Sequence, residues 1–190
     1  MDNIYFDVKK LKYFGIGARI SKTTRIRNPE ECIIGDGVII DDFTYISCPI
    51  EIAPHCHISS HCSISGGAGR FKMGAYSTLS SHVSIHTCSS DYRSISLDLP
   101  SVPKGLQFGG EVGYVEIGEF VTIGSHSVIL PNVKIKNGVA CGAFSLLKQE
   151  EYVENGLYMG VPAKFHSLRD NKELLRWINE NPDALYTIFN

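Results

Sequence analysis

An aliphatic or similarly buried residue returns every six positions over most of this chain. The positions on this repeat are Ile34, Ile40, Ile46, Ile52, Ile58 and Ile64, then Met73, Leu79 and Ile85, then Ile117, Ile123, Ile129, Ile135, Cys141 and Leu147. A helix needs a period near 3.6 and a half-buried strand alternates at two, so neither explains the pattern. A short fixed period is typical of a solenoid, in which each unit buries its apolar residue by stacking on its neighbours.

Each six-residue unit has two apolar or compact positions, the first and the fifth, and often a small residue at the second, such as Gly35, Gly118 or Gly124. This arrangement suits a short strand followed by a tight corner. Three units then close a triangular coil of about 18 residues, and stacked coils form a parallel β-helix. We expect coils over about 13–86 and 115–148.

Composition narrows the possible functions. The chain has 190 residues and a formal net charge of −2, which argues against a dedicated nucleic-acid binder. We find neither a signal peptide nor an apolar stretch long enough to span a membrane. Of the six cysteines, Cys56 and Cys62 are in phase with the small residues of the repeat, and Cys141 lies on the repeat itself. They predict reduced core residues in a cytoplasmic protein.

The repeat breaks twice, and we expect chemistry at the breaks. A long one follows His86 and fills residues 87–114, where Pro100, Pro103 and several glycines exclude regular structure over much of the segment. Loops of this length are usually functional or disordered. A shorter break lies between Ile64 and Met73 and contains a glycine-rich loop.

The C-terminal part has a different character. Asp170 to Glu173 form a helix-start signal, Leu174, Leu175 and Ile178 follow at helical spacing, and Pro182 should end or kink that helix. We expect this helix to pack against a coil or a neighbouring subunit. The predicted division is a β-helix domain over 1–165, with the loop 87–114 inserted, and a helical tail over 166–190.

Three segments carry a resemblance to a known family. They are Ile85-His86-Thr87 before the polar loop, the run Ile117-Gly-Glu-Phe-Val-Thr-Ile-Gly-Ser-His-Ser-Val, and Gly160-Val-Pro-Ala-Lys164. Together they resemble the hexapeptide-repeat acyltransferases, and among these the galactoside and maltose O-acetyltransferases. The resemblance covers about 34–169. It implies a left-handed β-helix, a homotrimer, acetyl-CoA as co-substrate and His86 as the general base.

The chemistry of acyl transfer fits a histidine at this place. A thioester is already activated, so the enzyme needs no covalent nucleophile and must only remove a proton from the attacking acceptor. Imidazole, with a pKa near 6.5, suits that task at neutral pH. The predicted acceptor-binding residues are Asp91, Tyr92, Arg93 and Glu111. Either carboxylate could orient His86 or hold the acceptor, and both are equally consistent with solvated loop charges.

The resemblance also indicates where coenzyme A would lie. Gly124, Ser125, Gly142, Ala143 and Ser145 match the positions beside the pantetheine arm, and the amide near Gly124 and Ser125 is a candidate oxyanion donor. Lys148 and Lys164 stand near the basic positions that meet the phosphates, with Arg169 as a further candidate. We expect no metal.

Several functions remain open. The favoured one is O-acetylation of a sugar in surface polysaccharide or lipopolysaccharide synthesis, and the alternative is N-acetylation of a nucleotide-linked amino sugar. A γ-type carbonic anhydrase would use His82, His86 and His126 as zinc ligands, shared across a subunit interface. A non-catalytic scaffold is the third class. His61 and His82 share position four of their units but need not touch.

Overall fold

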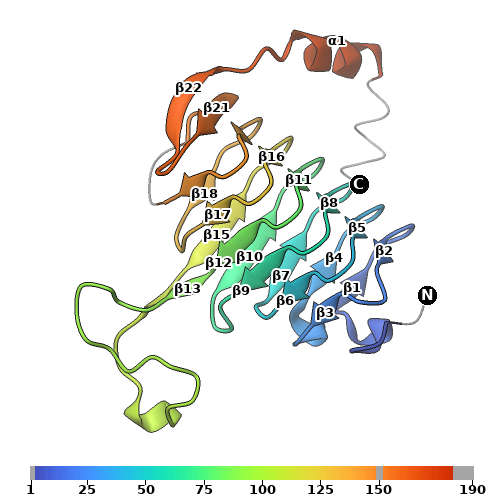
Figure 1. Cartoon of the computed structure of the whole chain (residues 1–190). Helices are drawn as coiled ribbons and strands as arrows, with labels where there is room; N and C mark the ends of the chain where they lie inside the picture. Colours follow the sequence, from blue (N-terminus) through green and yellow to red (C-terminus); the bar gives the residue numbers. More distant parts are fainter. Residues whose placement is uncertain (1–2, 149–151, 182–190) are drawn as a thin grey trace.

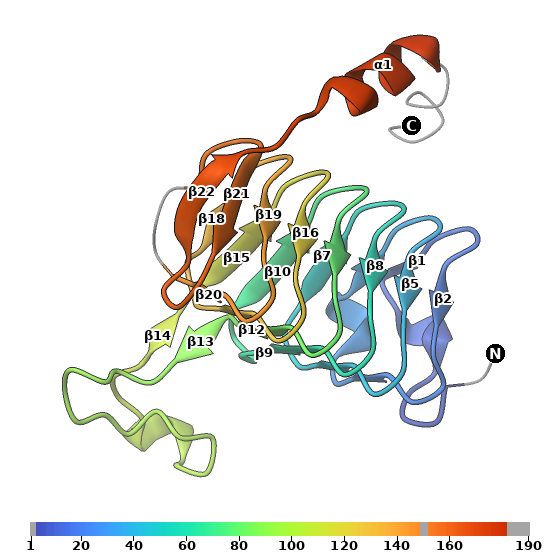
Figure 2. The same cartoon turned by 45° about the horizontal axis from the view of Figure 1, so that its top comes forward.

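In the computed structural model, which describes residues 3–148 and 152–181, the chain winds into a triangular stack of coils (Figures 1 and 2). Each side of the triangle is one sheet whose coil strands run parallel, and we name the sheets A, B and C in the order in which each coil contributes a strand to them. Sheet A contains β1 (Tyr13–Phe14), β4 (Ile33–Ile34), β7 (Ile50–Ile52), β10 (Arg70–Met73), β15 (Tyr114–Ile117) and β18 (Lys134–Ile135).

Sheet B contains β2 (Arg19–Ile20), β5 (Ile39–Ile40), β8 (His57–Ile58), β11 (Thr78–Leu79), β16 (Thr122–Ile123), β19 (Ala140–Cys141), β21 (Gly156–Met159) and β22 (Lys164–Leu168). Sheet C contains β3 (Arg25–Ile26), β6 (Tyr45–Ile46), β9 (Ser63–Ser65), β12 (Ser84–His86), β17 (Val128–Ile129) and β20 (Leu146–Leu147).

The six-residue repeat forms the core, as predicted. Every residue of the repeat from Ile34 to Leu147 is buried, and so are the compact residues at position five, such as Val38, Cys56 and Val121. Backbone groups bond from coil to coil; the amide of Gly35, for example, donates to the carbonyl of Ile52 at 2.8 Å. The buried side chain of each coil therefore packs on that of the next coil. A single unit would leave this side chain exposed to water and could not fold alone.

Aromatic rings stack along two corners of the triangle. Where sheet B turns into sheet C, five rings form one ladder, with centroids 4.6–5.0 Å apart. The members of this B–C ladder are Phe43, His61, His82, His126 and Phe144. His61 and His82, which need not have touched, are thus neighbours at 4.8 Å. A second ladder of His55, Tyr76 and Phe120 follows the corner between sheets A and B.

The short break in the repeat lengthens one coil. Facing residues are usually 18 apart, as in Ile34 and Ile52, but Ser65 faces His86 at a separation of 21. The extra residues lie in the turn after β9, where Gly66 and Gly67 have positive φ. A Cβ on Gly69 would lie 2.5 Å from the Cβ of Thr87, so glycine lets this turn pack directly under the residue after His86.

The long break leaves the solenoid at the end of sheet C (Figures 1 and 2). Its base is a short antiparallel pair, β13 (Cys88–Ser89) with β14 (Glu111–Val112), in which Cys88 faces Val112. The outer part holds the 3-10 helix η3 (Lys104–Leu106) and projects away from the coils. The amide of Gly113 donates to the carbonyl of Thr87 at 2.7 Å, so the entry and exit of the loop are joined.

Beyond the last coil, sequence reasoning missed a hairpin. β21 joins sheet B in parallel, and β22 runs antiparallel to it, with Gly160 to Pro162 in the turn between them.

The helix α1 (Lys172–Glu180) starts where its signal predicts and lies apart from the coils in Figure 2. Pro182 lies outside the described residues. Among the described helices, none is long and apolar enough to cross a membrane.

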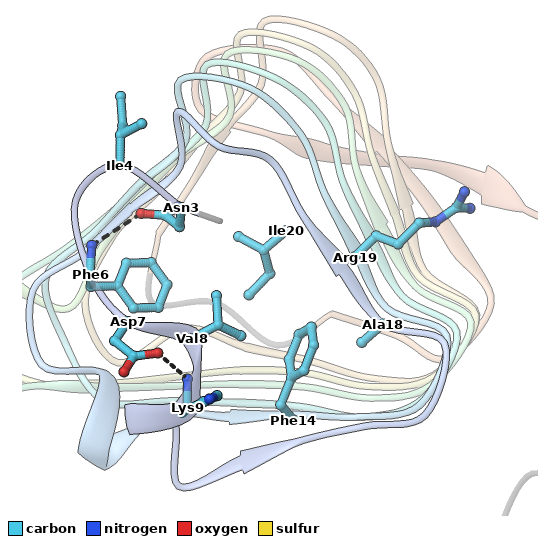
Figure 3. A pocket seen from close by; sticks show the side chains of 10 residues that line it. All are labelled: Asn3, Ile4, Phe6, Asp7, Val8, Lys9, Phe14, Ala18, Arg19 and Ile20. Carbon is cyan, nitrogen blue, oxygen red and sulfur yellow. Dashed lines mark hydrogen bonds between the residues drawn. The ribbon is translucent and has the colours of Figure 1, made fainter. Parts of the chain in front are cut away.

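The segment from Asn3 to Lys10 crosses the open end of the first coil. This segment includes the 3-10 helix η1 (Val8–Lys10), while η2 (Pro29–Glu31) lies in the second coil. Figure 3 looks into the end of the core, where Phe6, Val8 and Ile20 line a recess of about 740 Å³. Phe14, which extends the repeat backwards, is 39% exposed here because no earlier coil covers it.

Candidate active site

A cleft of about 990 Å³ lies where the long loop meets sheet C. It is lined by His86, by the predicted acceptor residues Asp91, Tyr92, Arg93 and Glu111, and by Lys148. These residues come from the end of β12, from both arms of the loop and from the coil that ends at β20. The structure therefore gathers into one cleft residues that are up to 62 positions apart in the sequence. Their roles stay predictions.

His86 is placed by the repeat itself. Ile85 points into the core, so the alternation of the strand turns the half-buried His86 outward. Its Nδ1 lies 3.5 Å from the hydroxyl oxygen of Ser65, which faces it from β9. Among the described contacts, the partner of the imidazole is therefore Ser65, whereas we considered Asp91 or Glu111 for this place.

Asp91 is engaged within its own loop. Its carboxylate accepts from the amide of Arg93 at 2.8 Å and from the hydroxyl of Ser94. The hydrogen bond from Ser94, then that from Arg93, holds the pKa of Asp91 below its usual range. This carboxylate thus shapes the turn of the loop that carries Tyr92, whose side chain is 93% exposed.

A residue of the solenoid holds Glu111 in place. Its Oε1 accepts from the side-chain amide of Asn132 at 2.6 Å, and Asn132 belongs to the turn after β17. Asn132 also accepts from the backbone amide of Tyr114 at 3.1 Å through its Oδ1. The contact connects the returning arm of the loop to the coil that follows it.

The floor of the cleft is apolar. Val128, Leu130 and Pro131 line it, next to β12 on sheet C. Sequence reasoning missed these three residues, together with Ser65, Cys88 and Asn132. Outward-facing positions of the repeat vary freely in type, so nothing in the sequence distinguishes those that happen to lie beside a loop.

The predicted coenzyme A residues lie mostly elsewhere. Gly124 and Ser125, and in the next coil Gly142 and Ala143, form turns of the B–C corner beside the ring ladder. Ser145 is 2% exposed, and its hydroxyl donates to the carbonyl of Gly142 at 2.7 Å, because position five of the repeat points inward. The Ser145 side chain therefore cannot contact a ligand bound at the surface of this structure.

The basic residues divide between two places. Lys148 lines the cleft, whereas the exposed Lys164 begins β22. Arg169 is exposed, and its guanidinium donates to the carbonyls of Gly138 at 2.6 Å and Phe120 at 3.3 Å. This hydrogen bonding ties the end of the hairpin to the corner between sheets A and B.

Within one chain, the three histidines of the zinc alternative do not lie together. His82 and His126 stack on each other in the B–C ladder, while His86 lines the cleft at the other end of its strand. Within residues 3–148 and 152–181, no group of three or more histidine, cysteine, aspartate and glutamate side chains is arranged to hold a metal ion.

No family model matches the chain. A curated protein of Escherichia coli, dTDP-4-amino-4,6-dideoxy-D-glucose acyltransferase, is 33% identical over 179 residues, which cover 92% of this chain and 91% of the relative. The solved structure of AntD, an N-acyltransferase from Bacillus cereus, in complex with dTDP and 3-hydroxybutyryl-CoA has a TM-score of 0.85 at 29% identity, covering 97% of this chain and 99% of that one.

A maltose O-acetyltransferase from Clostridium difficile has a TM-score of 0.60 at 16% identity, over 86% of this chain and 73% of that one, and shows a shared fold alone. The two more similar proteins favour the N-acyl alternative over the O-acetylation that the sequence led us to prefer. The left-handed β-helix, the repeat and the likeness along nearly the whole chain agree, and the chain belongs to the hexapeptide-repeat acyltransferases.

Proposed function

We propose that this acyltransferase moves an acyl group from a coenzyme A thioester to the amino group of a nucleotide-linked amino sugar. dTDP-4-amino-4,6-dideoxyglucose is the acceptor to test first, because the E. coli relative is named for it and an AntD structure contains it with coenzyme A. The observation that carries the proposal is the cleft in which His86 meets both arms of the loop.

In the proposed reaction, the amine nitrogen attacks the thioester carbonyl carbon. A C–N bond forms, the C–S bond breaks and the coenzyme A thiolate leaves. His86 accepts the proton that the amine loses, and the proton then passes to the thiolate, so the enzyme returns to its starting state. Ser65 lies beside Nδ1 and leaves Nε2 as the nitrogen for this transfer.

The two substrates would approach the cleft from different sides. The loop offers polar and charged groups for the sugar nucleotide, and Lys148 and Arg93 offer cations for its phosphates. The glycine-containing turns of the B–C corner offer backbone amides to the pantetheine arm. A homotrimer, which family resemblance implies, would bring the corner of one subunit near the loop of another.

The test is direct. Purified protein is incubated with acetyl-CoA or 3-hydroxybutyryl-CoA and dTDP-4-amino-4,6-dideoxyglucose, and the product is identified by mass spectrometry. Resistance of the product to hydroxylamine marks an amide, whereas an ester is cleaved. Transfer only to hydroxyl groups would favour O-acylation, and the absence of transfer to any amino-sugar nucleotide would overturn the proposal.

A further inference from the structure

Asn132 connects Glu111 to the solenoid through two hydrogen bonds of different kinds. Its Oδ1 accepts from the Tyr114 backbone amide at 3.1 Å, and its Nδ2 donates to Oε1 of Glu111 at 2.6 Å. The backbone amide can only donate, so the oxygen of the side chain must face it. The NH₂ group then necessarily faces the carboxylate.

Few other side chains could make both contacts. Aspartate would also accept from the Tyr114 amide, but its second oxygen would repel Glu111. Asn132 has φ 63°, a conformation that asparagine tolerates better than most residues. A Cβ on Gly113 would lie 2.5 Å from Oδ1 of Asn132, so glycine is what lets the returning chain pass this close.

We infer that Asn132 is a positioning residue that holds the Glu111 carboxylate at the cleft to recognise the cationic amine of the acceptor. This inference rests on the proposed function, since an amine is its ligand. Aliphatic amines are mainly protonated at neutral pH, and a charge-assisted hydrogen bond to a carboxylate is the interaction that distinguishes them from hydroxyl groups.

Glu111 suits this role better than the other carboxylate of the cleft. Asp91 is held within its own turn of the loop. Glu111 instead stands on β14, whose pairing with β13 fixes it close to the end of β12, where His86 lies. An ammonium group bound by Glu111 would therefore lie near His86. It loses one proton to solvent before the nitrogen attacks, and His86 takes the second proton as the C–N bond forms.

The chain offers a matched control. Asn137 accepts from the backbone amide of Glu119 at 2.9 Å, also 18 residues away and also after a glycine, Gly118. It makes the same backbone contact in the corner between sheets A and B, away from the cleft. Asn137→Asp thus measures the effect of replacing an asparagine in such a turn while the residues that line the cleft stay unchanged.

The experiment measures the binding of two ligands by calorimetry: dTDP-4-amino-4,6-dideoxyglucose and its analogue with a hydroxyl group in place of the amine. We expect the wild type to prefer the amine. Glu111→Gln and Asn132→Asp should each reduce this preference about tenfold, while Asn137→Asp retains it. Steady-state kinetics should show the loss in KM for the acceptor more than in kcat, because the contact is made before the transition state.

The double variant Asn132→Asp with Glu111→Gln separates positioning from folding. In it, the introduced glutamine amide would donate to the introduced aspartate carboxylate, which reverses the direction of the original hydrogen bond. The melting temperature should therefore return toward that of the wild type while the amine preference stays low. A preference restored in full would contradict the inference, as would an unchanged preference in Asn132→Asp. If the wild type itself shows no preference for the amine, the proposed acceptor class fails instead.

Discussion

His86 depends on residues on both sides of it in the chain. Ile85 anchors the strand in the core, and Thr87 donates through its backbone amide to the carbonyl of Ser65 at 2.7 Å. The imidazole is thus fixed at the last position before the chain leaves the solenoid. The proposed base therefore has a rigid backbone behind it and the long loop in front of it.

His86→Gln should lower kcat about 10²- to 10⁴-fold, because an amide cannot accept the proton that the attacking amine loses. Binding of coenzyme A, measured by calorimetry, should change little. His57→Gln is the control, since it alters a histidine of β8 on sheet B that does not line the cleft. An equal loss in both variants would contradict the assignment of His86 as the base.

At the scale of elements, the B–C ladder shows how stacked coils accommodate residues with an unfavourable positive φ. All five of its residues have φ between 57° and 64°, a region that non-glycine residues rarely adopt. Each ring stacks on the rings of the adjacent coils, and this contact offsets the backbone cost. The corner is therefore stabilised by neighbours, as the core is.

His82 lies in the middle of this ladder and provides a test. His82→Ala should destabilise the protein by about 1–2 kcal/mol, because it removes two ring contacts and keeps the strained backbone. His82→Gly also removes the rings but relieves the strain, so it should be about 1 kcal/mol more stable than the alanine variant. Chemical denaturation measures both. The reverse order of the two variants would show that the ring contacts do not offset backbone strain.

The sequence predicted the elements that obey a local rule. Inward residues recur at a fixed interval, so the coils, the core and the exit after His86 could be read from the repeat. The contact between His61 and His82 also follows from the repeat, since their units begin at Ile58 and Leu79, three units apart. It was missed because the three extra residues after Ser65 lengthen a turn without adding a unit. The hairpin of β21 and β22 lacks the repeat, and the pairing of Asn132 with Glu111 joins outward positions that no period constrains.

For the whole molecule, buried thiols connect stability to pH. Burial raises the pKa of Cys32, Cys48, Cys56 and Cys62 to about 11, and that of Cys141 to about 12. Unfolded thiols lose their protons near pH 9, so above this pH the folded state binds more protons than the unfolded state. The free energy of unfolding must then decrease as the pH rises from about 9 toward 11.

Each such thiol should contribute a decrease of about 1.4 kcal/mol per pH unit within that window. Urea denaturation at pH 8, 9 and 10 under reducing conditions measures the slope. Cys141→Val removes one of the thiols and should reduce the slope by about that amount, even though lysines and tyrosines titrate nearby. An unchanged slope in Cys141→Val would contradict the assignment.

The reversed direction of β22 has a consequence for self-assembly. The strands of the last coil in a parallel stack have unpaired backbone groups at their outer edges. The first coil of another molecule could pair with these edges and extend the stack into a fibre. On sheet B the antiparallel β22 covers that edge, and at the opposite end the segment before β1 crosses the first coil. A further parallel strand therefore cannot pair with β21 of sheet B while β22 occupies that edge.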